Sequence, residues 1–145
     1  MTARLTQISQ QIKMATRPNI HLYTTQTPNG VKISITLEEL GLPYEFTKID
    51  ISKNTQKEPW FLEINPNGRI PALTDTFEDG KQINLFESGS IQQYLVDEYD
   101  KDYKISYPKG TREYYEVNNW VWNASLPCCH NQILTTSSSS FSMPA

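Results

Sequence analysis

Two short stretches in the first third of the chain alternate apolar with polar residues, which is the pattern of half-buried β-strands. They are Ile20-His21-Leu22-Tyr23 and Tyr44-Glu45-Phe46-Thr47-Lys48-Ile49. Pro18 precedes the first stretch, and we predict that the organised part of the chain begins there. The pattern predicts strands over residues 20–23 and 44–49.

The segment between these strands, residues 31–40, fits two patterns. Its apolar residues alternate as in a strand, but Ile33 and Leu37 also stand at helical spacing. Thr27-Pro28 is typical of a helix start, with Thr27 as the N-cap and Pro28 at the first helical position, where its missing N–H costs nothing. Gly41 is typical of a helix end, so we predict a helix.

The downstream pattern predicts a short helix over residues 59–64, a third strand beginning at Ile70, a turn at Asp79-Gly80, a fourth strand over residues 82–86 and an amphipathic helix from Ser88. The resulting order is β-α-β-α-β-β-α. A strand-helix-strand start implies a parallel pair with a right-handed crossover, here followed by an antiparallel hairpin. We therefore predict an α/β protein with the thioredoxin-like arrangement.

The charged residues are unevenly distributed along the chain. A linker from Lys104 to Lys109 leads to a helical pattern over residues 111–122, yet no Asp, Glu, Lys or Arg follows Glu116. A stretch as long as the one from Val117 to Ala145 ordinarily holds about seven charged residues. We divide the chain into a disordered extension (residues 1–18), the thioredoxin-like domain (19–103), a linker with the first helix of an all-α domain (104–124) and a low-complexity disordered tail (125–145).

The overall composition excludes some classes of function. The 145 residues include 13 Lys and Arg against 16 Asp and Glu, a net charge of −3 that disfavours broad nucleic-acid binding. No stretch approaches the roughly 20 apolar residues of a transmembrane helix, so we expect no membrane partner. Residues 1–17 are amphipathic and lack acidic residues, as mitochondrial import signals do, but we interpret them as an untethered extension and expect a cytoplasmic protein.

The junction after the first strand is the best candidate for chemistry. In a sheet of this type ligands bind beyond the carboxyl ends of the parallel strands. The helix from Pro28 would present free N–H groups and the positive end of its dipole there, and a thiolate is an anion that fits. Thioredoxins place a Cys-x-x-Cys pair at this point, whereas this chain has Thr27-Pro28-Asn29-Gly30. A reacting sulfur must therefore come from a bound molecule.

Three motifs resemble the N-terminal domain of the glutathione transferases, in particular the nu class and the related fungal nitrogen-catabolite regulators. They are Thr27-Pro28-Asn29-Gly30, Asn65-Pro66-Asn67-Gly68-Arg69-Ile70-Pro71-Ala72-Leu73 and Phe86-Glu87-Ser88-Gly89, in matching order and spacing between Asn19 and Tyr99. The resemblance implies glutathione as cosubstrate, a small electrophile or disulfide as second substrate, and a homodimer. It implies either conjugation or disulfide reduction as the activity.

The resemblance also implies binding roles for the second motif. Ile70, preceding a cis-Pro71, would pair its backbone with the cysteinyl part of glutathione as if the tripeptide were an added strand. Gln56 would meet the glycyl end, and Arg69 is a lesser candidate nearby. A solvated surface position is the alternative for both side chains.

The third motif would hold the γ-glutamyl end. The resemblance implies that the Glu87 carboxylate meets the amino group of the ligand, and that Ser88, as an N-cap, faces its carboxylate. The alternative for Ser88 is an ordinary helix cap without a ligand.

Three residues are candidates for activating the sulfur. Asn29 is the first choice because the resembling proteins place this residue beside the sulfur, Thr27 is second, and Tyr23 is third. The alternative for Asn29 is a first-turn residue with no chemical role.

The two cysteines do not form a recognisable site. Cys128 and Cys129 are adjacent, which is the wrong spacing for a redox pair, and with His130 they provide too few ligands for a closed zinc site. We predict no metal and interpret these residues as incidental. His21 lies in a predicted strand and is interpreted as structural.

Three functional hypotheses remain. The first is an enzyme, the second a non-catalytic regulatory or binding module of the same fold, and the third an inactive truncated product. The glutathione transferases continue into an all-helical second domain that walls the electrophile pocket and forms much of the dimer interface, whereas the resemblance ends near Ala124. We therefore expect Trp120 and Trp122 to lack most packing partners, with lower solubility and weaker activity.

Overall fold

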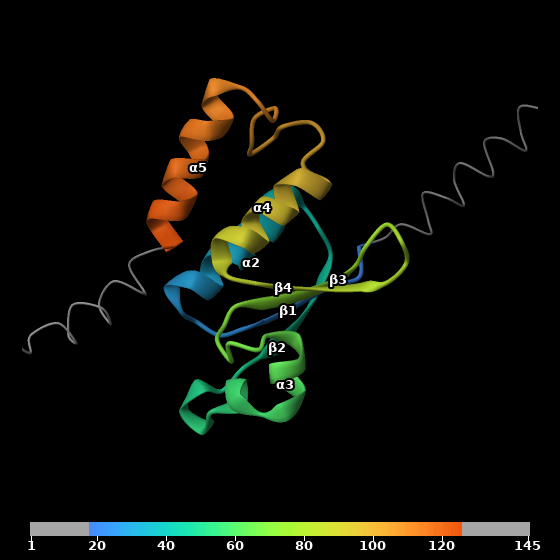
Figure 1. The fold of residues 1–145 in the computed structure, drawn as a ribbon, viewed down its shortest axis with the longest axis vertical. Helices are drawn as coiled ribbons and strands as arrows, with labels where there is room; N and C mark the ends of the chain where they lie inside the picture. The colour runs from blue at the N-terminus through green and yellow to red at the C-terminus, as the bar shows by residue number, and fades with distance from the viewer. Residues whose placement is uncertain (1–17, 126–145) are drawn as a thin grey trace, which may run out of the picture.

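A four-stranded sheet forms the centre of the computed structural model, which describes residues 18–125 (Figure 1). The strands are β1 (Ile20–Thr24), β2 (Tyr44–Lys48), β3 (Ala72–Thr76) and β4 (Gln82–Phe86), in the spatial order β2-β1-β3-β4. β1 and β2 are parallel, with Leu22 opposite Phe46, whereas β3 is antiparallel to both β1 and β4. The predicted extension except Pro18, the predicted tail except Ser125, and the Cys128-Cys129-His130 run lie outside the described residues.

Helices cover both faces of this sheet. Figure 1 shows α2 (Pro28–Leu40) and α4 (Ser88–Tyr99) together on one side and α3 (Pro59–Ile64) on the other. Two short 3-10 turns, η1 (Ile51–Lys53) and η2 (Thr55–Lys57), connect β2 to α3. The predicted order β-α-β-α-β-β-α and the thioredoxin-like arrangement are confirmed. An additional helix, α5 (Arg112–Ser125), follows α4.

The ambiguous segment before β2 is a helix. Thr27 is its N-cap, with Oγ1 accepting from the Gly30 amide at 3.1 Å, and Gly41 ends it in the left-handed conformation with φ 66°. Ile33 is fully buried, but Ile35 is 55% exposed. The strand-like alternation was therefore misleading, because the helical spacing selects the buried residues.

The apolar core has two parts, one on each face of the sheet. The larger part packs α2 and α4 against the strands and comprises Ile20, Leu22, Ile33, Leu37, Leu73, Ile91 and Leu95. The smaller part lies under α3 and comprises Ile49, Phe61 and Ala72. Alternate residues of β1 and β3 thus face opposite layers, as the two-residue period of a strand requires.

Two predicted boundaries are corrected by the structure. The third strand begins at Ala72 rather than Ile70, because its pairing with β1 and β4 begins at Ala72. The Ile70–Pro71 peptide that precedes it is cis. The last helix begins at Arg112 and extends to Ser125, three residues beyond the predicted end at Trp122.

The buried Asp100 carboxylate fixes the start of the segment that connects α4 to α5. Asp100 accepts hydrogen bonds from the Lys104 amide at 2.7 Å, the Ile105 amide at 3.0 Å and the Ser106 hydroxyl at 2.6 Å. Burial alone would raise the pKa of Asp100, but these donors outweigh it and hold the pKa below its usual value.

The α5 helix is the least buried of the long helices. It has no buried residue, and Trp120 and Trp122 are 74% and 51% exposed. Its inner side contacts α4, where Gln93 donates to the Tyr114 hydroxyl at 3.1 Å. The two tryptophans accordingly lack most packing partners among the described residues.

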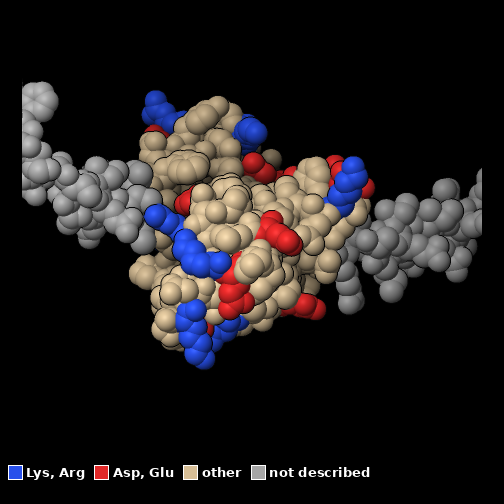
Figure 2. Space-filling model, turned by 60° about the horizontal axis from the view of Figure 1, so that its bottom comes forward, with Lys and Arg blue, Asp and Glu red and all other residues tan. Residues whose placement is uncertain are grey.

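The described surface carries both signs of charge. Figure 2 shows one face, on which lysines and arginines are interspersed with acidic residues and separated by uncharged areas. None of the described helices combines the length and apolarity needed to cross a membrane.

Candidate functional site

A small cavity lies where the start of α2, the loop before β3 and the start of α4 meet. Its volume is about 60 Å³. The residues that line it are Asn29, Asn65, Arg69, Ile70, Pro71, Glu87, Ser88 and Ser125. All of these except Asn65 and Ser125 are predicted site residues, so the fold brings three distant motifs together at one place.

The first wall is the N-terminal turn of α2. Gly30 allows this turn to approach β1 closely, because a Cβ there would lie 2.1 Å from Thr24 Oγ1 and 2.5 Å from the Thr25 carbonyl oxygen. Asn29 lies half-buried beside it, and its Oδ1 accepts a hydrogen bond from Lys32 Nζ at 2.9 Å. The other end of the Asn29 amide is a donor.

The second wall is the loop from Asn65 to Pro71. Asn65 is buried, donates to the Arg69 carbonyl at 2.7 Å and accepts from the Asn67 amide at 3.0 Å. The pairing of β3 with β1 begins at Ala72. The backbone of Ile70 therefore lies beyond the paired part of the strand, where an extended peptide could align with it.

The third wall is the start of α4. Glu87 has φ 68° and ψ 122°, a strained combination for any residue with a side chain. The structure corrects the prediction that Ser88 is the N-cap: Glu87 occupies the cap position, and Ser88 is the first helical residue. Ser88 is buried, and its hydroxyl lies 3.4 Å from that of Ser125 at the end of α5.

Three predicted residues do not line this cavity. The Thr27 hydroxyl accepts from the Gly30 amide as a helix cap. Tyr23 packs on the α3 side of the sheet, stacked on His21 with ring centroids 4.3 Å apart. His21 also contacts Thr47 Oγ1 at 2.7 Å. Gln56 lies in η2, and its amide oxygen is buried without a hydrogen-bond partner among the described residues.

The orphaned Gln56 oxygen is informative because a buried unpaired polar atom is costly. The neighbouring backbone is tightly packed, since a Cβ on Gly68 would lie 2.8 Å from the Gln56 carbonyl oxygen. Gln56 is thus held in place with an acceptor that nothing in the described chain satisfies.

The electrostatics of the cavity favour an anion. The first turns of α2 and α4 both contribute residues to it, and helix N-termini carry partial positive charge on free N–H groups. The Arg69 residue and the Glu87 carboxylate add charges of both signs. The positive helix ends and Arg69, together with the negative Glu87, suit a zwitterionic ligand that carries carboxylates and an amino group.

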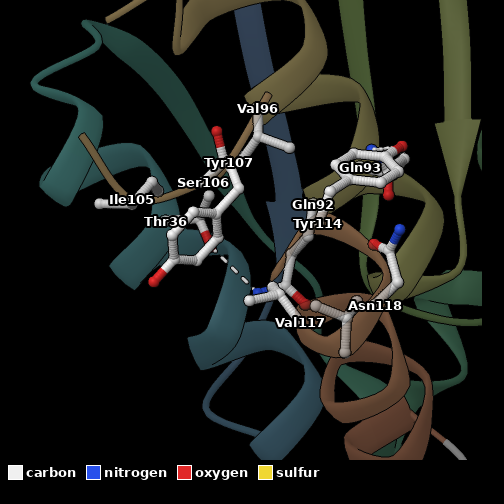
Figure 3. A pocket seen from close by; sticks show the side chains of 11 residues that line it. Thr36, Gln92, Gln93, Val96, Ile105, Ser106, Tyr107, Tyr114, Val117 and Asn118 are labelled. Carbon is white, nitrogen blue, oxygen red and sulfur yellow. Dashed lines mark hydrogen bonds between the residues drawn. The ribbon is translucent and has the colours of Figure 1, made fainter. Parts of the chain in front are cut away.

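A second cavity lies between α4, α5 and the segment that connects them (Figure 3). Its volume is about 100 Å³, and its apolar wall includes Val96, Ile105 and Val117. Gln92 donates to Thr36 Oγ1 across its floor at 3.2 Å. None of the predicted site residues lines it, so it is separate from the candidate site.

The residues missed from sequence are Asn65, Ser125 and Lys32. Asn65 was part of a recognised turn, and its burial was the undetected feature. Ser125 of α5 approaches Ser88 of α4 at the cavity, and Lys32 contacts Asn29 from the next turn of α2. Among residues 18–125, no three His, Cys, Asp or Glu side chains are grouped as a metal site.

Comparisons with known proteins show the family of this chain. A family model described as "Glutathione S-transferase, N-terminal domain" matches residues 18–97. The glutathione S-transferase-like protein gedE of Aspergillus terreus is 46% identical over 95 residues, which are 66% of this chain and 40% of that protein. Disulfide-bond oxidoreductase YfcG of Escherichia coli is 46% identical over 80 residues, 54% of this chain and 37% of that protein.

Two further likenesses extend the comparison. Protein URE2 of Debaryomyces hansenii is 47% identical over 75 residues, 52% of this chain and 24% of that protein. The crystal structure of a glutathione transferase homolog from Lodderomyces elongisporus, with two GSH per subunit, has a TM-score of 0.71 and 46% identity, covering 85% of this chain and 60% of that one. The chain thus spans less than half the length of these curated relatives.

Proposed function

The chain belongs to the glutathione S-transferase family, and from this premise we propose that the cavity at the start of α2 and α4 binds glutathione and activates its thiol. The observation that carries the proposal is the convergence of Asn29, Ile70 and Ser88 on one cavity, although these residues are far apart in sequence.

The binding mode follows from the donors and acceptors around the cavity. The cysteinyl backbone aligns with Ile70, beyond the start of the β3 pairing. The ligand amino group meets the Glu87 carboxylate, and the γ-glutamyl carboxylate meets the Ser88 hydroxyl and the N-terminus of α4. The resemblance assigns Gln56 to the glycyl end, although Gln56 does not line the cavity and its side-chain oxygen is buried.

Thiol activation is assigned to Asn29 and the start of α2. Lowering a thiol pKa from about 8.5 by two units requires roughly 2.7 kcal/mol of selective stabilisation of the thiolate. A hydrogen bond from the Asn29 amide N–H, together with the helix dipole, is of the right size. Thr27 is the second candidate, since it caps the same helix.

The reaction that we propose is reduction of a small disulfide. The activated thiolate attacks one sulfur of the substrate, forms a mixed disulfide and expels the other sulfur as a thiolate, which takes up a proton. A second glutathione thiolate attacks the mixed disulfide, giving glutathione disulfide and the second reduced thiol. The likeness to a disulfide-bond oxidoreductase favours this reaction over conjugation to an electrophile.

A non-catalytic binding module is the second candidate, which the resemblance to the fungal nitrogen-catabolite regulators allows. Binding of glutathione without turnover of a disulfide or an electrophile would favour this module over the enzyme.

The test of the proposed function is titration of the full chain with reduced glutathione by isothermal calorimetry. We expect saturable binding that Ser88→Ala weakens about tenfold, because the variant removes a hydroxyl at the carboxylate position. Ser90→Ala is the matched control, since Ser90 lies in the same helix but does not line the cavity, and it should bind like wild type. Absence of binding to the folded wild-type chain would overturn the proposal.

Turnover is measured separately. The consumption of reduced glutathione is followed with hydroxyethyl disulfide and with a chlorinated dinitrobenzene as alternative substrates. Preference for the disulfide supports reduction, preference for the aromatic chloride supports conjugation, and turnover of neither supports the binding module.

A further inference from the structure

Lys32 lies one helical turn beyond Asn29 on α2, and its ammonium lies against two acceptors. It donates to Asn29 Oδ1 at 2.9 Å and to the carbonyl of Ala124 in the last turn of α5. Lys32 is half-buried and does not itself line the cavity. Its contact with the site therefore passes through Asn29.

The ammonium determines which way the Asn29 amide faces. An asparagine amide has an acceptor end and a donor end, whereas an ammonium can only donate. Lys32 consequently holds the oxygen of Asn29 on its own side, and the NH₂ group faces away from it. Rotation of the amide by half a turn would place an oxygen where the proposed thiolate lies, and two acceptors would then repel each other.

A positive charge at this place acts in the same direction. The Asn29 side chain lies between the ammonium and the proposed position of the sulfur. A nearby cation stabilises the thiolate form of a thiol. The ammonium also donates to the Ala124 carbonyl, so the last turn of α5 helps to hold it in position.

We propose that Lys32 is a positioning residue for thiol activation, which orients the Asn29 amide so that its N–H donors face the glutathione sulfur. This inference rests on the proposed function, because it requires glutathione to bind with its sulfur beside Asn29. The inference adds Lys32 to the residues of the proposed site, although the Lys32 side chain does not line the cavity.

The test is the pKa of the bound glutathione thiol, followed by the ultraviolet absorbance of the thiolate in a pH titration of the full chain. Lys32→Met should raise this pKa by about one unit, from about 6.5 to about 7.5, which reduces the thiolate fraction about threefold at pH 7. Lys32→Arg retains a cationic donor and should restore most of the effect. Lys81→Met removes a lysine from the exposed hairpin loop and should leave the thiol pKa unchanged.

A double-mutant cycle separates positioning through Asn29 from an independent effect of charge. If Lys32 acts mainly through Asn29, the Asn29→Ala/Lys32→Met variant should have a thiol pKa only slightly above that of Asn29→Ala, and this small remainder measures the direct effect of the charge. Additive shifts, or a thiol pKa unchanged in Lys32→Met, would overturn the inference while leaving glutathione binding intact.

The remaining outcomes are also decisive. If Lys32→Met does not fold, Lys32→Ala replaces it in the same measurements: a raised thiol pKa supports the inference, and a wild-type value contradicts it. If the folded wild-type chain binds no glutathione, the proposed function fails, and the inference fails with it.

Discussion

The side-chain amide of Asn65 donates to the carbonyl of Arg69 at 2.7 Å, across the turn that precedes Ile70. The same side chain accepts from the Asn67 amide at 3.0 Å. A single buried residue therefore fixes the loop that presents one wall of the cavity.

Replacing Asn65 by Ala should lower the free energy of unfolding by roughly 2–3 kcal/mol, because two backbone groups lose their partner at a buried position. Chemical denaturation measures this change, and calorimetry should show weaker glutathione binding. Asn67→Ala is the matched control, since Asn67 is exposed and bonds through its backbone. Equal stability of the two variants would contradict the role of the Asn65 side chain.

Two substitutions of Glu87 distinguish its effect on the stability of the fold from its effect on glutathione binding. Glu87→Gly and Glu87→Ala both remove the carboxylate, and both should weaken glutathione binding about tenfold. Only glycine relieves the strained backbone at φ 68°, so Glu87→Gly should be more stable than Glu87→Ala by about 1 kcal/mol in denaturant unfolding. Glu78→Ala, in the exposed hairpin loop, should bind like wild type; an order in which alanine is more stable than glycine would argue against strain.

Gly30→Ala tests the close approach of α2 to β1. Alanine favours a helix by about 1 kcal/mol over glycine, but here its Cβ would lie 2.5 Å from the Thr25 carbonyl oxygen. We expect a net loss of roughly 2 kcal/mol in the free energy of unfolding. Glu39→Ala, at an exposed position of the same helix, should change it by less than about 0.5 kcal/mol. A stabilised Gly30→Ala variant would be inconsistent with the described packing.

The alkaline stability of the fold should depend on two tyrosines of α4. Tyr94 donates to the buried Asp75 carboxylate at 3.0 Å, and Tyr99 donates to the same oxygen. Burial, followed by the effects of Asp75, raises the pKa of both phenols well above the usual value near 10. The unfolded chain therefore loses these protons first, and stability is lost as the pH rises above about 10.

Urea denaturation between pH 8 and pH 11 measures this loss. Each tyrosine contributes a decline of at most about 1.4 kcal/mol per pH unit, reduced by its partial exposure to solvent. Tyr94→Phe should therefore show a shallower decline than wild type, relative to its own stability at pH 8. Tyr107→Phe, at a residue that is 46% exposed, should retain the wild-type slope, and identical slopes for all three chains would refute the prediction.

Local patterns in the sequence were sufficient for the elements and for the three motifs. Thr27 and Gly41 mark the ends of α2, and they outweighed a strand-like alternation that would have buried Ile35 beside Ile33, whereas Ile35 is exposed on the helix. The start of β3 was predicted too early, because Ile70 is apolar and looks like a strand residue although the pairing begins at Ala72.

The missing parts of the prediction depend on contacts between elements. The approach of Lys32 to the carbonyl of Ala124, and of Ser125 to Ser88, joins residues from different helices. Neither contact leaves a periodic signal in the sequence. The folded arrangement was needed to place α5 beside the site.

The two ends of the described chain have unequal access to the cavity. Asn19 is tied to Asp75 before β1, so about 16 Å of strand separates it from the turn that carries Asn29. Ser125 instead lines the cavity. Chains that share residues 19–125 but continue differently after Ser125 should therefore keep the same cavity walls and differ in the surface beside Ser125.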